Sequence, residues 1–188
     1  MKKFINSYLN ETKHLLDSSI QKYSDDLIDI SEKFKKTSKE GGKIILLGNG
    51  GSAATCSHVS VDLTKNAKIR SINFNEADLI TCFSNDYSYE DWMKKSLEFY
   101  LDKKDIVVLI STSGKSANII NAAKFLKKKK VKIITLTGMK KDNPLKKLNN
   151  NGVNIWVNSK SYNQIEIIHH FLLLMIVDII IGKSIYKA

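Results

Sequence analysis

Short apolar runs alternate with stretches of helical periodicity along most of this chain. The runs are rich in Ile, Val and Leu and are bounded by Gly, Asn, Ser or Lys, a pattern typical of strands. A strand buried on both faces is apolar throughout rather than at every second position, so the runs favour a parallel sheet that helices cover on both sides. We expect strands at residues 43–47, 69–73, 106–110, 132–137 and 153–157.

The stretches between these runs carry apolar side chains at helical spacing. Residues 4–39 are predicted to form one or two helices, which Gly41-Gly42 ends before the first strand. Ser52 is expected to cap the helix after that strand, and Pro144 to begin a short helix later in the chain. The other predicted helices cover residues 53–63, 75–84, 89–101, 117–129 and a last segment from Tyr162.

Together these elements predict a single three-layer α/β/α domain over residues 1–188, with a central and mostly parallel sheet. We expect the helical segment 1–40 to pack on this domain or on a neighbouring subunit. The stretch 165–181 is apolar, but Glu166 and Asp178 interrupt it and it is short for a bilayer. It is therefore predicted to be a long C-terminal helix buried in the protein or in a subunit interface.

Composition and charge narrow the class of protein. At 43% hydrophobic residues the chain can bury a substantial core. Lys and Arg exceed Asp and Glu by 30 to 19, which either makes a solvated surface or attracts anionic partners. A nucleic acid is the less expected partner, because no helix-turn-helix, zinc finger or RNA-binding signature is present. Cys56 and Cys82 are too few for a disulfide framework, and the start of the chain lacks the apolar core of a signal peptide, so we expect a cytoplasmic protein.

Two turns rich in Gly and Ser, each directly after an apolar run, carry the strongest chemical signal. Gly48-Asn49-Gly50-Gly51-Ser52 fits neither the dinucleotide fingerprint nor the P-loop. Ser111-Thr112-Ser113-Gly114-Lys115-Ser116 offers four hydroxyl groups around one glycine. Both could be plain turns with a capping serine, yet a strand, a small-residue turn and a helix start place free N–H groups where an anion binds. We therefore predict a phosphorylated small molecule at the strand ends.

Ionisable side chains at helical spacing supply candidate chemistry. His58 and Asp62 are four residues apart, as are Glu166 and His170, so each pair shares a helix face. A carboxylate beside a bound sugar can move a proton between adjacent carbons, and the same side chains could bind a divalent metal or merely form surface pairs. His169 and His170 are adjacent and point to different faces, so at most one of them is expected to reach a site.

The segment Asn85-Asp86-Tyr87 is predicted to form a turn before the helix at 89–101. Asn and Asp favour such turns because their side chains hydrogen-bond to nearby backbone. Alternatively, Asn85 and Asp86 hydrogen-bond to the hydroxyl groups of a sugar.

With these residues in view, the chain resembles the sugar isomerase (SIS) domain family and, within it, the phosphoheptose isomerase group. The resemblance covers nearly the whole chain. Its most specific parts are residues 48–54, the Ser-Asn-Asp-Tyr at 84–87 and residues 111–118. It implies a flavodoxin-like SIS fold and isomerisation of sedoheptulose 7-phosphate, or a related phosphosugar, for surface polysaccharide synthesis. It also implies a homotetramer with active sites between subunits.

The resemblance assigns roles residue by residue. The implied substrate contacts are Asn49, Gly50, Gly51, Ser52, Asn85, Asp86, Ser111, Thr112, Ser113 and Ser116. The implied catalytic residues are Asp62, where the family has a glutamate, and Glu166, where it has a glutamine. No cofactor is implied as required, with zinc an option at His58, Asp62 and Glu166.

The family's late catalytic histidine falls at Leu174, which cannot transfer a proton. His170, one helical turn earlier, could replace it. Three hypotheses follow. The first is an aldose–ketose isomerase that works through an enediol. The second is a non-catalytic module that binds a phosphosugar or a protein partner, which Leu174 favours. The third is direct DNA binding through the positive charge.

Overall fold

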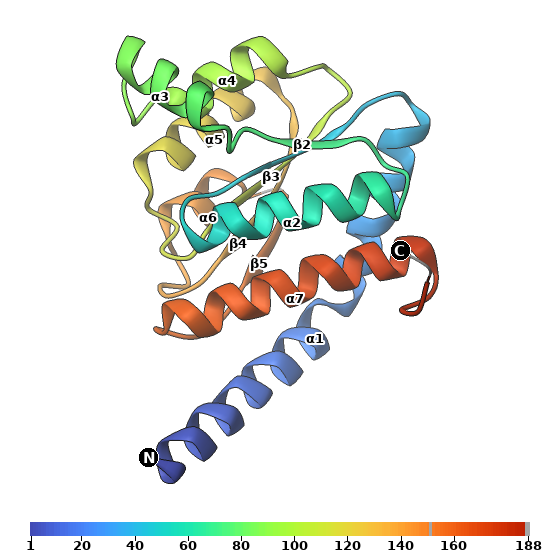
Figure 1. Cartoon of the computed structure of the whole chain (residues 1–188), viewed down its shortest axis with the longest axis vertical. Helices are drawn as coiled ribbons and strands as arrows, with labels where there is room; N and C mark the ends of the chain where they lie inside the picture. The colour runs from blue at the N-terminus through green and yellow to red at the C-terminus, as the bar shows by residue number, and fades with distance from the viewer. Residues whose placement is uncertain (151, 187–188) are drawn as a thin grey trace.

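The computed structural model describes residues 1–150 and 152–186 and contains one five-stranded parallel sheet with helices on both faces (Figure 1). The strands lie in the order β2-β1-β3-β4-β5. Their bounds are β1 Ile44–Leu47, β2 Ser71–Asn73, β3 Ile106–Ser111, β4 Lys132–Thr137 and β5 Val153–Trp156. The predicted α/β/α architecture with a parallel sheet is confirmed.

Strand β1 lies beside β3, and this pairing marks the point where the strand order reverses. The register places Leu46 opposite Val108 and Leu47 opposite Leu109. On one side of this point the chain adds β2, and on the other side it adds β4 and β5. In open parallel sheets, ligands bind beyond the carboxyl ends of the strands at such a reversal. The fold therefore directs attention to the segments that follow β1 and β3.

The two faces of the sheet bury two separate cores. Ile44 and Leu46 of β1 face the first core, and Ile45 and Leu47 face the second, so every residue of this strand is buried. This explains why the strand reads as a continuous apolar run. The first core is covered by α1 (Lys2–Lys39), α2 (Gly51–Lys65) and α7 (Tyr162–Ile181). The second is covered by α4 (Trp92–Tyr100), α5 (Ala117–Lys129) and α6 (Pro144–Leu148), with α3 (Ala77–Asp86) beside α4.

Two predicted boundaries were wrong by a few residues. Helix α2 begins at Gly51, so Ser52 lies inside the helix and Gly50, with φ +54°, occupies the cap position. The positive φ suits a residue without a Cβ, which lets the chain enter the helix earlier than expected. Asn85 and Asp86 end α3 rather than forming a turn after it, because the Tyr87 N–H donates to the Phe83 carbonyl and continues the helical pattern.

Helices α1 and α7 are each only partly covered by the rest of the chain. The buried residues of α1 begin only at Ser19, and its N-terminal half projects past α7 (Figure 1). Helix α7 is long and apolar enough to cross a membrane, but here it packs beside α1 and α2 over the first core. Ile167 and Phe171 remain exposed on its outer side. The expected burial of this helix is thus realised on one side only within a single chain.

A buried carboxylate fastens the amino ends of β1 and β3. The Asp105 side chain accepts hydrogen bonds from the backbone N–H groups of Lys43 (2.9 Å) and Asp102 (2.8 Å). It also pairs with the Lys43 ammonium at 2.7 Å, and its side chain is completely buried. Asp102 contacts the same ammonium from an exposed position.

Replacing Asp105 by Ala should lower the free energy of unfolding by about 3 kcal/mol, because the two N–H groups and the partly buried ammonium lose their acceptor. Urea unfolding followed by circular dichroism would measure the loss. Asp102→Ala is the matched control, and its effect should be much smaller because water already solvates that carboxylate. Equal losses of unfolding free energy in the two variants would contradict the role given to the buried Asp105 carboxylate.

Candidate functional site

The two Gly/Ser turns meet at the carboxyl edge of the sheet. Asn49 of the first turn and Asn118, in the first turn of α5, exchange two side-chain hydrogen bonds of 2.9 and 3.0 Å. Asn118 is buried, and its Oδ1 also accepts from the Ile119 N–H at 2.9 Å. Both turns follow neighbouring parallel strands and lie at one edge of the sheet, where this amide pair joins them.

The glycines of the first turn bring neighbouring groups unusually close. A Cβ at Gly48 would lie 2.7 Å from the Ser52 carbonyl carbon, so only glycine fits there. A Cβ at Gly51 would overlap the carboxylate of Glu166 on α7. The first residue of α2 therefore lies directly against Glu166, and this part of α2 presents its unpaired N–H groups beside a carboxylate and the second turn.

The second turn gathers its hydroxyl groups around the end of β3. Ser111, the last residue of β3, and Ser116, the cap residue of α5, lie 3.2 Å apart through their hydroxyl oxygens. Ser113 accepts from the Lys115 N–H at 3.3 Å. The Thr112 hydroxyl is buried and has no hydrogen-bond partner among the described residues. A buried hydroxyl without a partner is costly, so it marks a place where a polar ligand would be stabilising.

A line of ionisable side chains runs between α2 and α7. His170 Nε2 lies 2.9 Å from His58 Nδ1, and the opposite nitrogen of His58, Nε2, lies 3.5 Å from Asp62 Oδ2. Asp62 also accepts from the Asn66 amide at 3.1 Å. Partial burial lowers the pKa of His170, nearby His58 lowers it further, and Asp62 opposes both. These causes favour a neutral His170 near pH 7.

The carboxylates of Asp62 and Glu166 are not brought together. Glu166 lies against Gly51, whereas Asp62 is eleven residues farther along α2, about 16 Å of helix. The His58 ring also has its two nitrogens directed to different partners, so its donors do not converge with those of Asp62 and His170 on one point. Among residues 1–150 and 152–186, no three His, Cys, Asp or Glu side chains are grouped to hold a metal ion. The set predicted for zinc does not fit a metal in this arrangement.

His169, unlike His170, lies in the core and serves the packing of the fold rather than the candidate site. It is completely buried, and its Nε2 lies 3.1 Å from the carbonyl oxygen of Thr137, the last residue of β4. Since a carbonyl can only accept, Nε2 carries the hydrogen and Nδ1, which has no partner among the described residues, carries the lone pair. Burial lowers the pKa of His169 to about 4. This contact holds α7 at the carboxyl edge, in the orientation that directs Glu166 and His170 towards α2.

Asn85 and Asp86 lie at the exposed end of α3. Asn85 donates to the Asp86 carboxylate at 3.0 Å, and within the described part of the chain neither side chain hydrogen-bonds to the two turns. The connection from this region is made instead by Tyr89, whose hydroxyl donates to Asn49 Oδ1 at 3.4 Å. Sugar contact by Asn85 and Asp86 stays a prediction.

Three contacts at the candidate site were not predicted from the sequence. Asn118 follows the second turn but has no spacing that reveals its pairing with Asn49. Tyr89 is an aromatic residue shortly before a helix, and nothing in its position along the sequence indicates its contact with Asn49. The contact of His58 with His170 joins residues 112 positions apart in the chain, although the two i,i+4 pairs had marked both residues as candidates.

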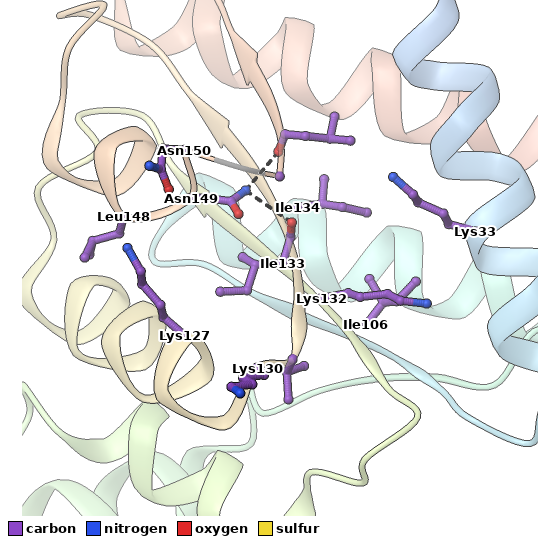
Figure 2. A pocket seen from close by; sticks show the side chains of 13 residues that line it. Lys33, Ile106, Lys127, Lys130, Lys132, Ile133, Ile134, Leu148, Asn149 and Asn150 are labelled. Carbon is purple, nitrogen blue, oxygen red and sulfur yellow. Dashed lines mark hydrogen bonds between the residues drawn. The ribbon is translucent and has the colours of Figure 1, made fainter.

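A separate cavity of about 430 Å³ lies at the opposite, amino edge of the sheet (Figure 2). It opens where β5 begins two residues later than β4, and the Asn149 amide there donates to the carbonyls of Ile133 and Val153, both at 3.1 Å. Lysines, among them Lys33 and Lys132, surround it. None of the predicted site residues lines this cavity.

Comparison with known proteins agrees with this geometry. Residues 7–138 match the model of the SIS domain family. A phosphoheptose isomerase from Cytophaga hutchinsonii is 34% identical over 139 residues, which cover 70% of this chain and 73% of the relative. A phosphoheptose isomerase from Maridesulfovibrio salexigens is also 34% identical, and there the match spans 65% of this chain but only 63% of the relative's length.

Solved structures of the same group share the fold over nearly the full chain. A phosphoheptose isomerase from Neisseria gonorrhoeae superposes with a TM-score of 0.88, covering 96% of this chain and 98% of the other at 24% identity. One from Francisella tularensis gives a TM-score of 0.89 at 24% identity, covering 97% and 99%. The projecting first helix and the long last helix are thus included in the shared architecture.

The buried neutral His169 should make the protein less stable in acid. Its folded pKa of about 4 lies below the unfolded value of 6.5, so the stabilisation is complete above pH 6.5 and is lost as the pH falls towards 4. The difference corresponds to as much as about 3 kcal/mol. Urea unfolding at pH 7.5 and 4.5 should show that His169→Gln loses less stability on acidification than the wild type. His14→Gln, at an exposed position on α1, should behave like the wild type, and an unchanged acid loss in His169→Gln would contradict the assignment.

Proposed function

The chain belongs to the SIS domain family, in its phosphoheptose isomerase-like group, and we propose that it interconverts the aldose and ketose forms of a phosphorylated sugar with six or seven carbons. The observation that carries this proposal is the pair of hydrogen bonds between Asn49 and Asn118, which joins the two turns beside the ionisable side chains of α2 and α7. Sedoheptulose 7-phosphate is the first substrate to test, because the relatives are named for the phosphoheptose reaction.

The second turn is the proposed phosphate site. Ser111, Thr112, Ser113 and Ser116 supply hydroxyl groups, and α5 begins directly behind them, so the N–H groups of Ala117 and Asn118 lie at the positive end of the helix. The partnerless Thr112 hydroxyl supports this role, because a phosphate oxygen would supply the missing acceptor. No metal is needed to hold a dianion that several donors surround.

The sugar is proposed to extend from this phosphate towards the ionisable side chains of α2 and α7. Gly51 and His58 are separated by about 10 Å of helix, which suits an open chain of six or seven carbons better than a triose. Asn49, Gly50, Gly51 and Ser52 would orient the sugar near the phosphate. Asn85 and Asp86 would contact its hydroxyl groups from the end of α3.

Isomerisation requires one proton to move between adjacent carbons and another between their oxygens. Glu166, against the first turn of α2, is the carboxylate proposed to move a proton, and Asp62 is proposed to take part through the His58 ring that it faces. The reaction needs no redox cofactor. With a phosphosugar as substrate and two cysteines that form no disulfide, the proposed location is the cytoplasm.

A homo-oligomer, proposed as a tetramer, would cover the apolar surface that one chain leaves exposed. Phe4, Ile5 and Leu9 are 68%, 56% and 48% exposed on the projecting part of α1, and Phe171 on α7 is 41% exposed. Isolated exposed apolar residues are common, but several on one projecting helix face favour a protein interface. The proposed partner is a second copy of this chain.

The activity is tested with purified protein and a panel of six- and seven-carbon sugar phosphates, by following the aldose–ketose ratio in proton NMR spectra. Thr112→Val should weaken binding of the turned-over sugar phosphate about 10- to 100-fold, because it removes one hydrogen bond to a charged group. The same variant should unfold no more easily than the wild type in the absence of ligand, since a buried unpaired hydroxyl is lost.

Thr64→Val, near the far end of α2, is the matched control and should bind the sugar phosphate normally. Binding without turnover of any sugar in the panel would favour the non-catalytic hypothesis. Neither binding nor turnover would contradict the proposed function altogether.

Introducing a charge on the apolar face of α1 should dissociate the oligomer. Phe4→Asp is expected to shift the mass measured by light scattering after gel filtration towards that of one chain, because an aspartate would be buried in the interface at high cost. Asn10→Asp, on the opposite side of the same helix, should leave the assembly intact. A wild-type protein that runs as a monomer would contradict the proposed tetramer.

A further inference from the structure

Asp62, His58 and His170 form a line with one hydrogen bond, between the two histidines, and one ion-pair contact, between His58 and Asp62. A carboxylate can only accept, so the His58 nitrogen that faces Asp62, Nε2 at 3.5 Å, is the one that favours carrying a hydrogen. A neutral His58 then has its lone pair on Nδ1. The contact of 2.9 Å at Nδ1 must therefore receive a hydrogen from His170 Nε2. This leaves the lone pair of a neutral His170 on its remaining nitrogen, Nδ1.

A base held by a second group, which a third group orients, is the arrangement that activates proton-transferring side chains in many enzymes. Here the two imidazole rings stand edge to face, 84° apart with centroids at 4.9 Å, so each fixes the orientation of the other. His170 lies one helical turn beyond Glu166 on α7, and Glu166 lies against Gly51, the first residue of α2. One more turn along the same face lies Leu174, which has no proton to exchange.

Resting on the proposed function, we infer that His170 is the catalytic base of this chain, with His58 and Asp62 as the residues that position it. His170 Nδ1 takes the proton from the sugar carbon beside the carbonyl. The electron pair of that C–H bond forms the double bond of the enediol, and the carbonyl π pair moves onto its oxygen. The hydroxyl hydrogen of the first carbon passes to that oxygen, and His170 returns its proton to the former carbonyl carbon, so no redox partner is consumed.

The same geometry does not favour a mechanism that uses a metal ion. The two nitrogens of His58 point to opposite partners, and Glu166 lies against Gly51 at the start of α2, so these donors do not share a point at which an ion could sit. Turnover should therefore survive dialysis against EDTA. Activity that EDTA abolishes and added zinc restores would overturn the inference.

The decisive experiment compares wild-type protein with His170→Gln on the sugar phosphate that the wild type converts. We expect kcat to fall at least 100-fold while the affinity for the sugar phosphate, measured by calorimetry, changes by less than about threefold. In heavy water, deuterium incorporation at the reacting carbon should fall in the same proportion. A merely structural role would change the melting temperature or the affinity rather than the exchange of this one hydrogen.

His58→Gln keeps His170 but removes the ring that orients it, so an intermediate loss of kcat is expected, with exchange and turnover again falling together. His14→Gln, an exposed histidine on α1, is the matched control and should keep full activity. Full turnover and exchange in His170→Gln would overturn the inference and leave the proposed function standing. A wild-type protein that converts no sugar phosphate would overturn the proposed function and the inference with it.

Discussion

The pairing of β1 with β3 is the constraint on which the rest of this structure depends. Buried backbone groups must find hydrogen-bond partners, and a parallel sheet supplies them only when the strands lie in register. At the amino end, the buried Asp105 carboxylate holds the segments that lead into both strands. At the carboxyl end, Asn49 and Asn118 join the segments that leave them. Two turns that are 60 residues apart in the chain thereby become one surface.

The packing of α7 on the sheet has a similar effect on the ionisable residues. His169, neutral and buried, is bonded to the end of β4, and this fixes the rotation of the helix. With that rotation set, Glu166 and His170 face α2 and the exposed Phe171 faces outward. An apolar helix thus carries the candidate site residues on one side, the core on another and an uncovered apolar surface on a third. The composition of α7 resembles that of a membrane span because both its core-facing side and its exposed outer side are apolar.

Much of the fold could be predicted because buried strands and helices each have a characteristic spacing of apolar residues along the chain. The five predicted runs became the five strands, and the clearest of them, β1 and β3, are buried throughout and apolar except for Ser111 at the end of β3. The errors fell at helix ends, where one hydrogen bond decides the boundary. Ser52 looked like a cap, but the positive φ available to Gly50 started α2 earlier. The Tyr87 N–H extended α3 over Asn85 and Asp86 in the same way.

For the candidate site, the sequence by itself determined the types of chemistry: glycines and hydroxyls after two strands, and histidine–carboxylate pairs at helical spacing. Local spacing can specify which side chains share a helix face, because the helix repeat is constant. It cannot specify which helices touch, since that depends on the sum of many packing contacts between distant segments. Only the tertiary structure therefore decided that Glu166 lies against Gly51, that Asp62 lies far from it, and that His58 meets His170.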